Sequence, residues 1–158
     1  MGTKLRISPE RQEDEAAIAE LLDRAFGPGR LAKTAERLRE GNRSLRHLSF
    51  VAWRGARAVG CVRLWPIRVG DEEAILLGPF AVDEGERGNG LGARLIESAL
   101  DAVAKAGALP VLLVGDLSYY GRFGFAAARG AALPGPVDPS RVLVHGAPVG
   151  FGGLVRRS

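Results

Sequence analysis

Three alternating glycines occupy the junction between a predicted strand and a predicted helix, in the segment RGNGLG (residues 87–92). The apolar run ILLGPFAV (75–82) precedes them, and the amphipathic run ARLIESALDAVAKAG (93–107) follows. Glycine loses more backbone entropy on folding than any other residue, so three glycines here destabilise the fold. A ligand that must approach the main chain closely would explain their presence. A helix N-terminus offers unpaired N–H groups and a positive dipole end, and Arg87 and Arg94 add charge nearby. The segment therefore predicts a pyrophosphate cradle, with a turn that only requires positive φ angles as the alternative.

Length and composition favour one globular domain spanning residues 1–158. The chain is 25% charged and 46% hydrophobic, as ordinary globular domains are. It has no apolar stretch long enough to span a membrane, and its charged N-terminus lacks the apolar centre of a signal peptide. The single cysteine, Cys61, forms no internal disulfide. We therefore expect a cytoplasmic protein without a membrane partner.

The charge pattern argues against nucleic acid as a partner. The formal net charge is +4, from 22 basic and 18 acidic residues, and the arginines are scattered along the chain. Aromatic residues make up only 6% and few of them interleave with the arginines, as stacking on bases would require. A mildly basic chain suits an anionic small ligand equally well. His47 and His145 are far apart without ligand spacing around them, so we predict no metal site.

The middle of the chain predicts an antiparallel meander. LSFVAWR (48–54), AVGCVRLWPIRV (58–69) and AILLGPFAV (74–82) alternate as strands do, and short turns separate them. Strands joined so closely pair antiparallel. Pro79 cannot donate to a strand ladder, so we expect the sheet to be opened or bulged beside it.

Upstream of the meander, residues 4–8 predict a strand and Ser8–Pro9 a helix entry. Ile18, Leu21, Leu22, Ala25 and Phe26 would form one apolar face of that helix. The glycines and proline of GPG (27–29) would end it, and a second helix is expected over about residues 31–40.

Downstream of the meander, the pattern predicts a βαβ unit. The helix after the glycines is followed by the apolar strand PVLLVG (110–115), so this strand should run parallel to residues 74–82. YYGRFGF (119–125) begins a short helical turn, and the proline-rich tail would hold two more strands. The predicted fold class is α/β, with a mixed sheet built from an antiparallel N-terminal meander and a parallel βαβ unit.

The glycine turn is compatible with two kinds of nucleotide-binding site. In one, Gly88, Gly90 and Ala93 form a degenerate dinucleotide-binding fingerprint, with Asp116 as the acid that contacts the ribose. Against it, the residues DEGER (83–87) separate the strand end from the glycines, and Asp116 lies 28 residues beyond Gly88. An antiparallel meander before the βαβ unit is also not required by a doubly wound sheet.

The other possibility uses the whole stretch from 76 to 125, which resembles the GNAT superfamily of N-acetyltransferases. Residues 87–92 match the acetyl-coenzyme A signature Gln/Arg-x-x-Gly-x-Gly/Ala in full. The strand ending in AV before the signature, the long helix after it and the YxRFGF element at 120–125 match in order and spacing. LGPFAVDEGERGNGLG together with GDLSYYGRFGF is most similar to the bacterial branch called YhbS-like.

The resemblance implies the GNAT fold, acetyl-coenzyme A as cosubstrate and direct acetyl transfer to a primary amine on a small molecule. It also implies that the strand before the glycines splays from its parallel neighbour and admits the pantetheine arm. The main chain of that strand and of the glycine turn would then bind the cofactor. These predicted cofactor-binding residues are Phe80, Ala81, Val82, Arg87, Gly88, Asn89, Gly90, Leu91, Gly92 and Ala93.

Tyr120 stands where many members of the superfamily carry a catalytic tyrosine, so the resemblance makes it the general acid. An unperturbed tyrosine, with a pKa of about 10, is protonated at neutral pH. A core aromatic with a bonded hydroxyl is the alternative role for Tyr120. The general base stays open between Asp116, a water chain and an amine that arrives neutral, because residues 75–82 hold no carboxylate.

Two other functions remain open at this level. One is a GNAT-like module that binds acyl-coenzyme A without turning it over, and the other is a dinucleotide-dependent oxidoreductase domain. The identity of the acceptor amine and the oligomeric state, a homodimer included, are not fixed by the sequence.

Overall fold

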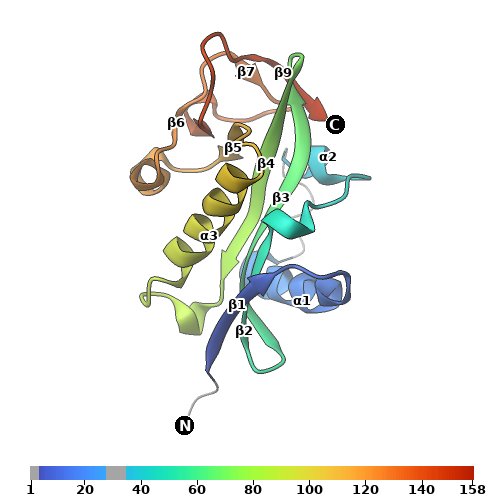
Figure 1. The fold of residues 1–158 in the computed structure, drawn as a ribbon, viewed down its shortest axis with the longest axis vertical. Coiled ribbons are helices and arrows are strands. Elements are labelled where there is room, and N and C mark those ends of the chain that lie inside the picture. Colours follow the sequence, from blue (N-terminus) through green and yellow to red (C-terminus); the bar gives the residue numbers. More distant parts are fainter. Residues whose placement is uncertain (1–3, 28–34) are drawn as a thin grey trace.

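The computed structural model describes residues 4–27 and 35–158, whose strands pair into a mixed sheet (Figure 1). Four strands form an antiparallel meander in chain order: β1 (Leu5–Pro9), β2 (Phe50–Arg54), β3 (Arg57–Val69) and β4 (Glu72–Val82). Turns of two residues join β2 to β3 and β3 to β4, which explains their antiparallel pairing. The predicted meander and the mixed α/β fold class are confirmed.

The predicted irregularity at Pro79 is present. Val62 pairs with Phe80, and Leu64 pairs with Leu77. Between these two pairs β4 therefore has the two residues Gly78 and Pro79 where β3 has one. The indole N–H of Trp65 donates a hydrogen bond to the Gly78 carbonyl and holds the bulged segment against β3.

The βαβ unit has the predicted polarity. Helix α3 (Leu91–Lys105) connects β4 to β5 (Val111–Val114), and the two strands run parallel. They pair at only two positions, Ile75 with Val111 and Leu76 with Leu112. Beyond Leu76, β4 and β5 have no further paired positions among the described residues, in agreement with the expected splay.

Helices cover both faces of the sheet. Helix α3 packs its buried side on the face of β3 that carries Val62 and Leu64. Helix α1 (Glu15–Phe26) packs on the opposite face, against Cys61. Successive residues of a strand point to opposite faces, so β3 separates the two layers. The α3 residues buried in this way are Leu91, Leu95, Ile96, Ala99 and Val103.

The expected helix entry at Ser8–Pro9 is wrong. Pro9 still belongs to β1, and the helical turns begin with η1 (Gln12–Asp14), which leads into α1. The buried Asp14 carboxylate accepts a hydrogen bond from the Arg11 N–H and so fixes the start of η1. Gly27, with φ of 72°, ends α1 as expected.

The second N-terminal helix, expected over residues 31–40, lies partly outside the described residues. Within the described part only α2 (Glu36–Arg39) is helical, with Leu38 buried against the sheet. Two short 3-10 turns, η3 (Arg46–Leu48) and η4 (Glu84–Glu86), lie before β2 and after β4. None of the helices in the described ranges has the length and apolar character of a membrane-crossing segment.

The C-terminal third holds more strands than the two expected. After α4 (Leu117–Tyr120) and η5 (Gly121–Phe123), four short strands occur among the described residues. They are β6 (Ala126–Ala127), β7 (Ala131–Ala132), β8 (Val142–His145, after η6 at Pro139–Arg141) and β9 (Gly153–Arg157). β8 pairs antiparallel with β5, and β9 pairs with the far end of β3. Strands of two residues are too short to show an alternation, which is why the sequence did not reveal them.

A buried ionic cluster joins β3 to the N-terminal segment. The Arg63 guanidinium donates to both carboxylate oxygens of Glu10, at 2.8 and 3.2 Å, and to Glu15 at 3.1 Å. Ser44 donates to Glu10 at 2.7 Å, and Arg63 stacks over Trp65 at 5.0 Å from the ring centroid. The Glu10 side chain has no exposed surface, so its charge is stable there only because of these partners.

Candidate functional site

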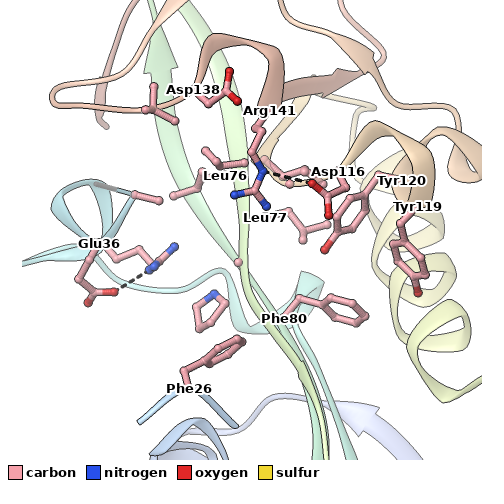
Figure 2. A pocket seen from close by; sticks show the side chains of 18 of the residues that line it. Phe26, Glu36, Leu76, Leu77, Phe80, Asp116, Tyr119, Tyr120, Asp138 and Arg141 are labelled. Carbon is pink, nitrogen blue, oxygen red and sulfur yellow. Dashed lines mark hydrogen bonds and ion pairs between the residues drawn. The ribbon is translucent and has the colours of Figure 1, made fainter. Parts of the chain in front are cut away.

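Two adjoining clefts lie where β4 separates from β5. One, of about 490 Å³, surrounds the N-terminus of α3 and is called the glycine cleft. The other, of about 730 Å³, is called the main cleft and lies between α2, the β4 bulge, the end of β5 and the 136–141 segment (Figure 2). Phe26, Phe80 and Tyr119 line both, so the clefts meet at these rings.

The glycine cleft contains free main-chain donors. Gly90 is the N-cap of α3, and the first long bond of the helix runs from the Arg94 N–H to the Gly90 carbonyl. The N–H groups of residues 91–93 therefore precede the hydrogen-bonded part of the helix, at its positive end. Gly88 and Gly90 have φ of 87° and 76°, and a Cβ on either would meet no protein atom within 4 Å. This open space beside bare amides fits a diphosphate.

Gly92 lines the glycine cleft and also makes room for protein side chains. A Cβ there would lie 3.1 Å from Cζ of Phe80 and 3.1 Å from the Tyr119 hydroxyl oxygen. The missing side chain therefore makes room for two protein rings against the first turn of α3, as well as for a ligand. These rings form the wall that the two clefts share.

The structure brings together the residues predicted to bind the cofactor, with the exception of Asn89. Those that line the glycine cleft are Phe80, Ala81, Val82, Arg87, Gly88, Gly90, Leu91, Gly92 and Ala93. Arg94, expected to add charge beside the glycines, is not among the residues that line either cleft.

Arg122 supplies the charge that the sequence analysis missed. It lines the glycine cleft, its Nε donates to the Tyr119 carbonyl at 3.0 Å, and its guanidinium lies 4.6 Å from the Tyr119 ring centroid. The parallel pairing of β4 and β5 places their carboxyl ends on the same side of the sheet. The glycine turn follows β4 and the YxRFGF element follows β5, so the two segments lie on that same side. The YxRFGF element was therefore a usable signal for a second arginine near the glycine turn.

Tyr120 lies in an aromatic cluster on the main-cleft side. Its ring is 5.0 Å from Tyr119, 5.9 Å from Phe125 and 6.3 Å from Phe80, centroid to centroid. Burial, with smaller contributions from Tyr119 and Asp116, raises the pKa of Tyr120 to about 12, so the phenol is neutral beside the cleft.

Two ion pairs face the main cleft. On one wall, Arg39 Nε lies 2.9 Å from Glu36 on α2. On the other, Arg141 Nε lies 3.3 Å from Asp116 Oδ1 (Figure 2). Asp138 also lines the cleft, and hydrogen bonds from the Ser140 N–H and hydroxyl lower its pKa. Neither α2 nor the 136–141 segment was expected to contribute charge here.

The backbone and the side chain of Asp116 have separate roles in the structure. Its carbonyl accepts the N–H groups of Tyr119 and Tyr120 and so begins α4, as a cap residue would. Its carboxylate makes no capping bond and instead lines the main cleft with Arg141. In the described ranges, no group of three His, Cys, Asp or Glu side chains is arranged to hold a metal ion.

The chain matches a known family over most of its length. Residues 15–125 match the model of the acetyltransferase (GNAT) family. The N-acetyltransferase YhbS of Escherichia coli K12 is 36% identical over 118 residues, which are 73% of this chain and 70% of that protein. The N-acetyltransferase YjhQ of the same strain is 30% identical over 133 residues, covering 80% and 74%.

Solved structures agree with these relatives. The crystal structure of E. coli YhbS in complex with coenzyme A has a TM-score of 0.81 and 30% identity, and the match covers 100% of this chain and 92% of that one. A GNAT family acetyltransferase from Brucella melitensis in complex with acetyl-coenzyme A has a TM-score of 0.65 and 29% identity, covering 91% and 97%.

Proposed function

Because the chain belongs to the acetyltransferase (GNAT) family, we propose that it transfers the acetyl group of acetyl-coenzyme A directly to a primary amine on a small molecule. One observation carries the proposal: a cleft of bare helix amides opens, at Phe80 and Tyr119, into a second cleft beside the neutral Tyr120. Similar proteins bind coenzyme A or acetyl-coenzyme A. Because the chain belongs to the acetyltransferase family, the alternative of a dinucleotide-dependent oxidoreductase domain is set aside.

The glycine cleft would hold the coenzyme. The amides of residues 91–93 and the open positions of Gly88 and Gly90 would bind the diphosphate, with Arg87 and Arg122 beside it. The main chain of 80–82, where β4 no longer pairs with β5, would bind the pantetheine arm. An N–H near Phe80 would polarise the thioester carbonyl.

The reaction forms a C–N bond, breaks a C–S bond and transfers, overall, one proton from the nitrogen to the sulfur. The nitrogen lone pair of a neutral amine attacks the thioester carbonyl carbon, and the tetrahedral intermediate then expels the coenzyme A sulfur. We assign Tyr120 as the general acid, whose O–H protonates the sulfur as the C–S bond breaks. The proton lost from the nitrogen restores the phenol, so coenzyme A leaves as the thiol and the enzyme is unchanged.

Asp116 is the carboxylate that lies on the Tyr120 side of the main cleft. We assign it as the base that takes the extra proton from the incoming ammonium, directly or through water, before the neutral amine attacks; this proton then passes to solvent. The side chain is 69% exposed, so it is well placed to exchange protons with solvent. This role is compatible with its carbonyl capping α4, because the carbonyl and the carboxylate act separately.

The test combines binding and turnover. We expect the wild-type protein to bind coenzyme A with a dissociation constant on the order of micromolar, and not NADH or FAD, in parallel calorimetric titrations. With acetyl-coenzyme A and a panel of small amines, thiol release should accompany an acetylated amine in the mass spectrum. Tight binding with no thiol release across the panel would favour the non-catalytic acyl-coenzyme A module.

The proposal extends to the cellular setting. A cytoplasmic location suits the chain because its one cysteine, Cys61, is buried and forms no disulfide. A homodimer stays a prediction, and light scattering on the purified protein tests it. One mass at all concentrations, equal to that of a single chain, would rule it out.

A further inference from the structure

We propose that the acceptor is an amine that carries a carboxylate next to the amino group, as an α-amino acid does, and that Arg141 binds this carboxylate. The inference rests on the proposed function, since it concerns the second substrate of the same site. It makes Arg141 a specificity-determining residue in the main cleft.

The first observation is the state of the Arg141 guanidinium. Its Nε lies 3.3 Å from Asp116 Oδ1, the shortest distance in that ion pair, and the guanidinium donates no hydrogen bond to any residue in the described part of the chain. Figure 2 shows the guanidinium directed from the 136–141 segment into the cleft, toward Leu77. A planar guanidinium with free Nη donors matches the two oxygens of a carboxylate.

The second observation is the position of this pair relative to the reacting groups. Asp116, Arg141 and Tyr120 all line the main cleft, and Figure 2 shows the Asp116–Arg141 pair beside the Tyr120 ring. They present a negative and a positive charge 3.3 Å apart. An α-amino acid has the complementary charges on neighbouring atoms, its ammonium toward Asp116 and its carboxylate toward Arg141.

The other charges of the main cleft are already matched. Glu36 is paired with Arg39, whose Nη1 lies 3.5 Å from the position of a Cβ on Gly78, over the β4 bulge. Asp138 accepts the N–H and hydroxyl of Ser140, and the positive charge of Arg141 also acts on it. An amine without a carboxylate would cover Arg141 and leave its Nη donors unpaired, which a polar site disfavours.

The remaining walls indicate the kind of side chain. Apolar residues from β4, β5 and the 136–141 segment surround the charged pairs, and the volume of about 730 Å³ exceeds what a small amino acid fills. They are Leu76, Leu77, Leu113, Val114 and Val137. L-Leucine and L-phenylalanine are therefore suitable probes.

The experiment compares matched acceptors and matched variants. With acetyl-coenzyme A, kcat/KM is measured for L-leucine and L-phenylalanine and for their carboxamides, which lack only the negative charge. We expect the wild type to prefer the acids by about 10- to 100-fold, the effect of a hydrogen-bonded charge. Arg141→Gln should remove this preference by lowering kcat/KM for the acids about 10- to 100-fold more than for the carboxamides, and Arg141→Lys should keep part of it. Arg129→Gln, an exposed arginine outside both clefts, is the control and should leave the preference unchanged.

The outcomes separate this inference from the proposed function. Equal use of acids and carboxamides, or an equal loss of both in Arg141→Gln, would overturn the inference and leave acetyl transfer intact. If none of the four acceptors reacts, the coenzyme A-loaded protein is titrated with N-acetyl-L-leucine and with N-acetyl-L-leucinamide. Binding of the acid alone, lost in Arg141→Gln, supports the inference, and any other binding result overturns it.

Discussion

The ring of Tyr120 lies against Gly115, with its Cε2 atom 2.5 Å from the position that a Cβ on Gly115 would take. Any side chain at residue 115 would collide with the proposed general acid. Gly115 does not have a positive φ, so its backbone would accept alanine, and the contacts that exclude it are with the Tyr120 ring and, at 3.1 Å, with Leu113 Cδ1. The orientation of Tyr120 therefore depends on a glycine at the end of β5.

Gly115→Ala should displace Tyr120 and lower kcat. A misplacement of about 1 Å at a reacting group can cost on the order of 10²-fold in rate, while the coenzyme A dissociation constant should change little. Stopped-flow or steady-state thiol release measures the first and calorimetry the second. Gly121→Ala is the control, because its Cβ would be in ordinary contact at 3.6 Å from Leu117. Equal rates in Gly115→Ala and Gly121→Ala would contradict the prediction.

Tyr120→Phe should lower kcat by about 10²- to 10⁴-fold, the usual contribution of a general acid, with the dissociation constant of coenzyme A unchanged. The ring and its aromatic contacts remain, so the fold should be intact by circular dichroism. Tyr119→Phe is the matched control, since Tyr119 lies on the wall shared by the clefts. A Tyr120→Phe enzyme with wild-type kcat would show that sulfur is protonated by another group.

The pH profile is an independent readout on the same residue. Burial disfavours the charged phenolate and so raises the pKa of Tyr120 to about 12, which leaves the hydroxyl protonated throughout pH 6–10. We expect wild-type kcat to show no alkaline decrease in that range from loss of the acid. A decrease centred near pH 9 that disappears in Tyr120→Phe would contradict the raised pKa.

Gly90→Ala should weaken coenzyme A binding about tenfold, because its Cβ would enter the open space beside the α3 amides. The left-handed φ of 76° also makes alanine unfavourable, by about 1 kcal/mol of folding free energy. Gly146→Ala separates the two effects, since Gly146 has φ of 73°, equally open space and no place in either cleft. Both variants should lose similar stability, and only Gly90→Ala should lose affinity; equal affinities would argue against a diphosphate at this turn.

Arg63→Met should reduce the free energy of unfolding by about 3–5 kcal/mol, because it leaves the buried Glu10 carboxylate without its main partner. Urea unfolding followed by circular dichroism measures this. Adding Glu10→Gln should recover part of the loss, since it removes the uncompensated charge. Arg68→Met, on the same strand but partly exposed, should cost far less. Similar losses for Arg63→Met and Arg68→Met would mean that the buried pair contributes little.

Local sequence signals were enough to predict the coenzyme side of the molecule. The meander, the irregularity at Pro79, the parallel βαβ unit and the family resemblance all rest on segments that are continuous in the chain, and all are confirmed. The glycine turn was recognisable because its backbone conformation requires glycine, and glycine can be read directly from the sequence. The general-acid role of Tyr120 remains a prediction, although the structure places the ring beside the main cleft.

The acceptor side could not be predicted because its pairs are formed across long sequence distances. Asp116 meets Arg141 from the proline-rich tail, where no periodic pattern identifies a strand or a facing residue. The Arg63–Glu10 pair joins residues 53 positions apart, and nothing near either residue indicates burial. Gly115 resembles an ordinary turn residue until the Tyr120 ring is placed against it.

The pairing of β4 with β5 at only two positions affects which amino-acid substitutions such a protein can tolerate. A linear molecule lying along the unpaired edge of β4 would occupy the place of a neighbouring strand. Its hydrogen bonds would be made with the peptide groups of β4, which are common to every residue. If the coenzyme binds there as proposed, most substitutions along this edge should leave its recognition in place, with proline as the exception. The acceptor cleft consists of side chains, so one replacement there can redirect the enzyme to a new amine while its acetyl donor stays the same.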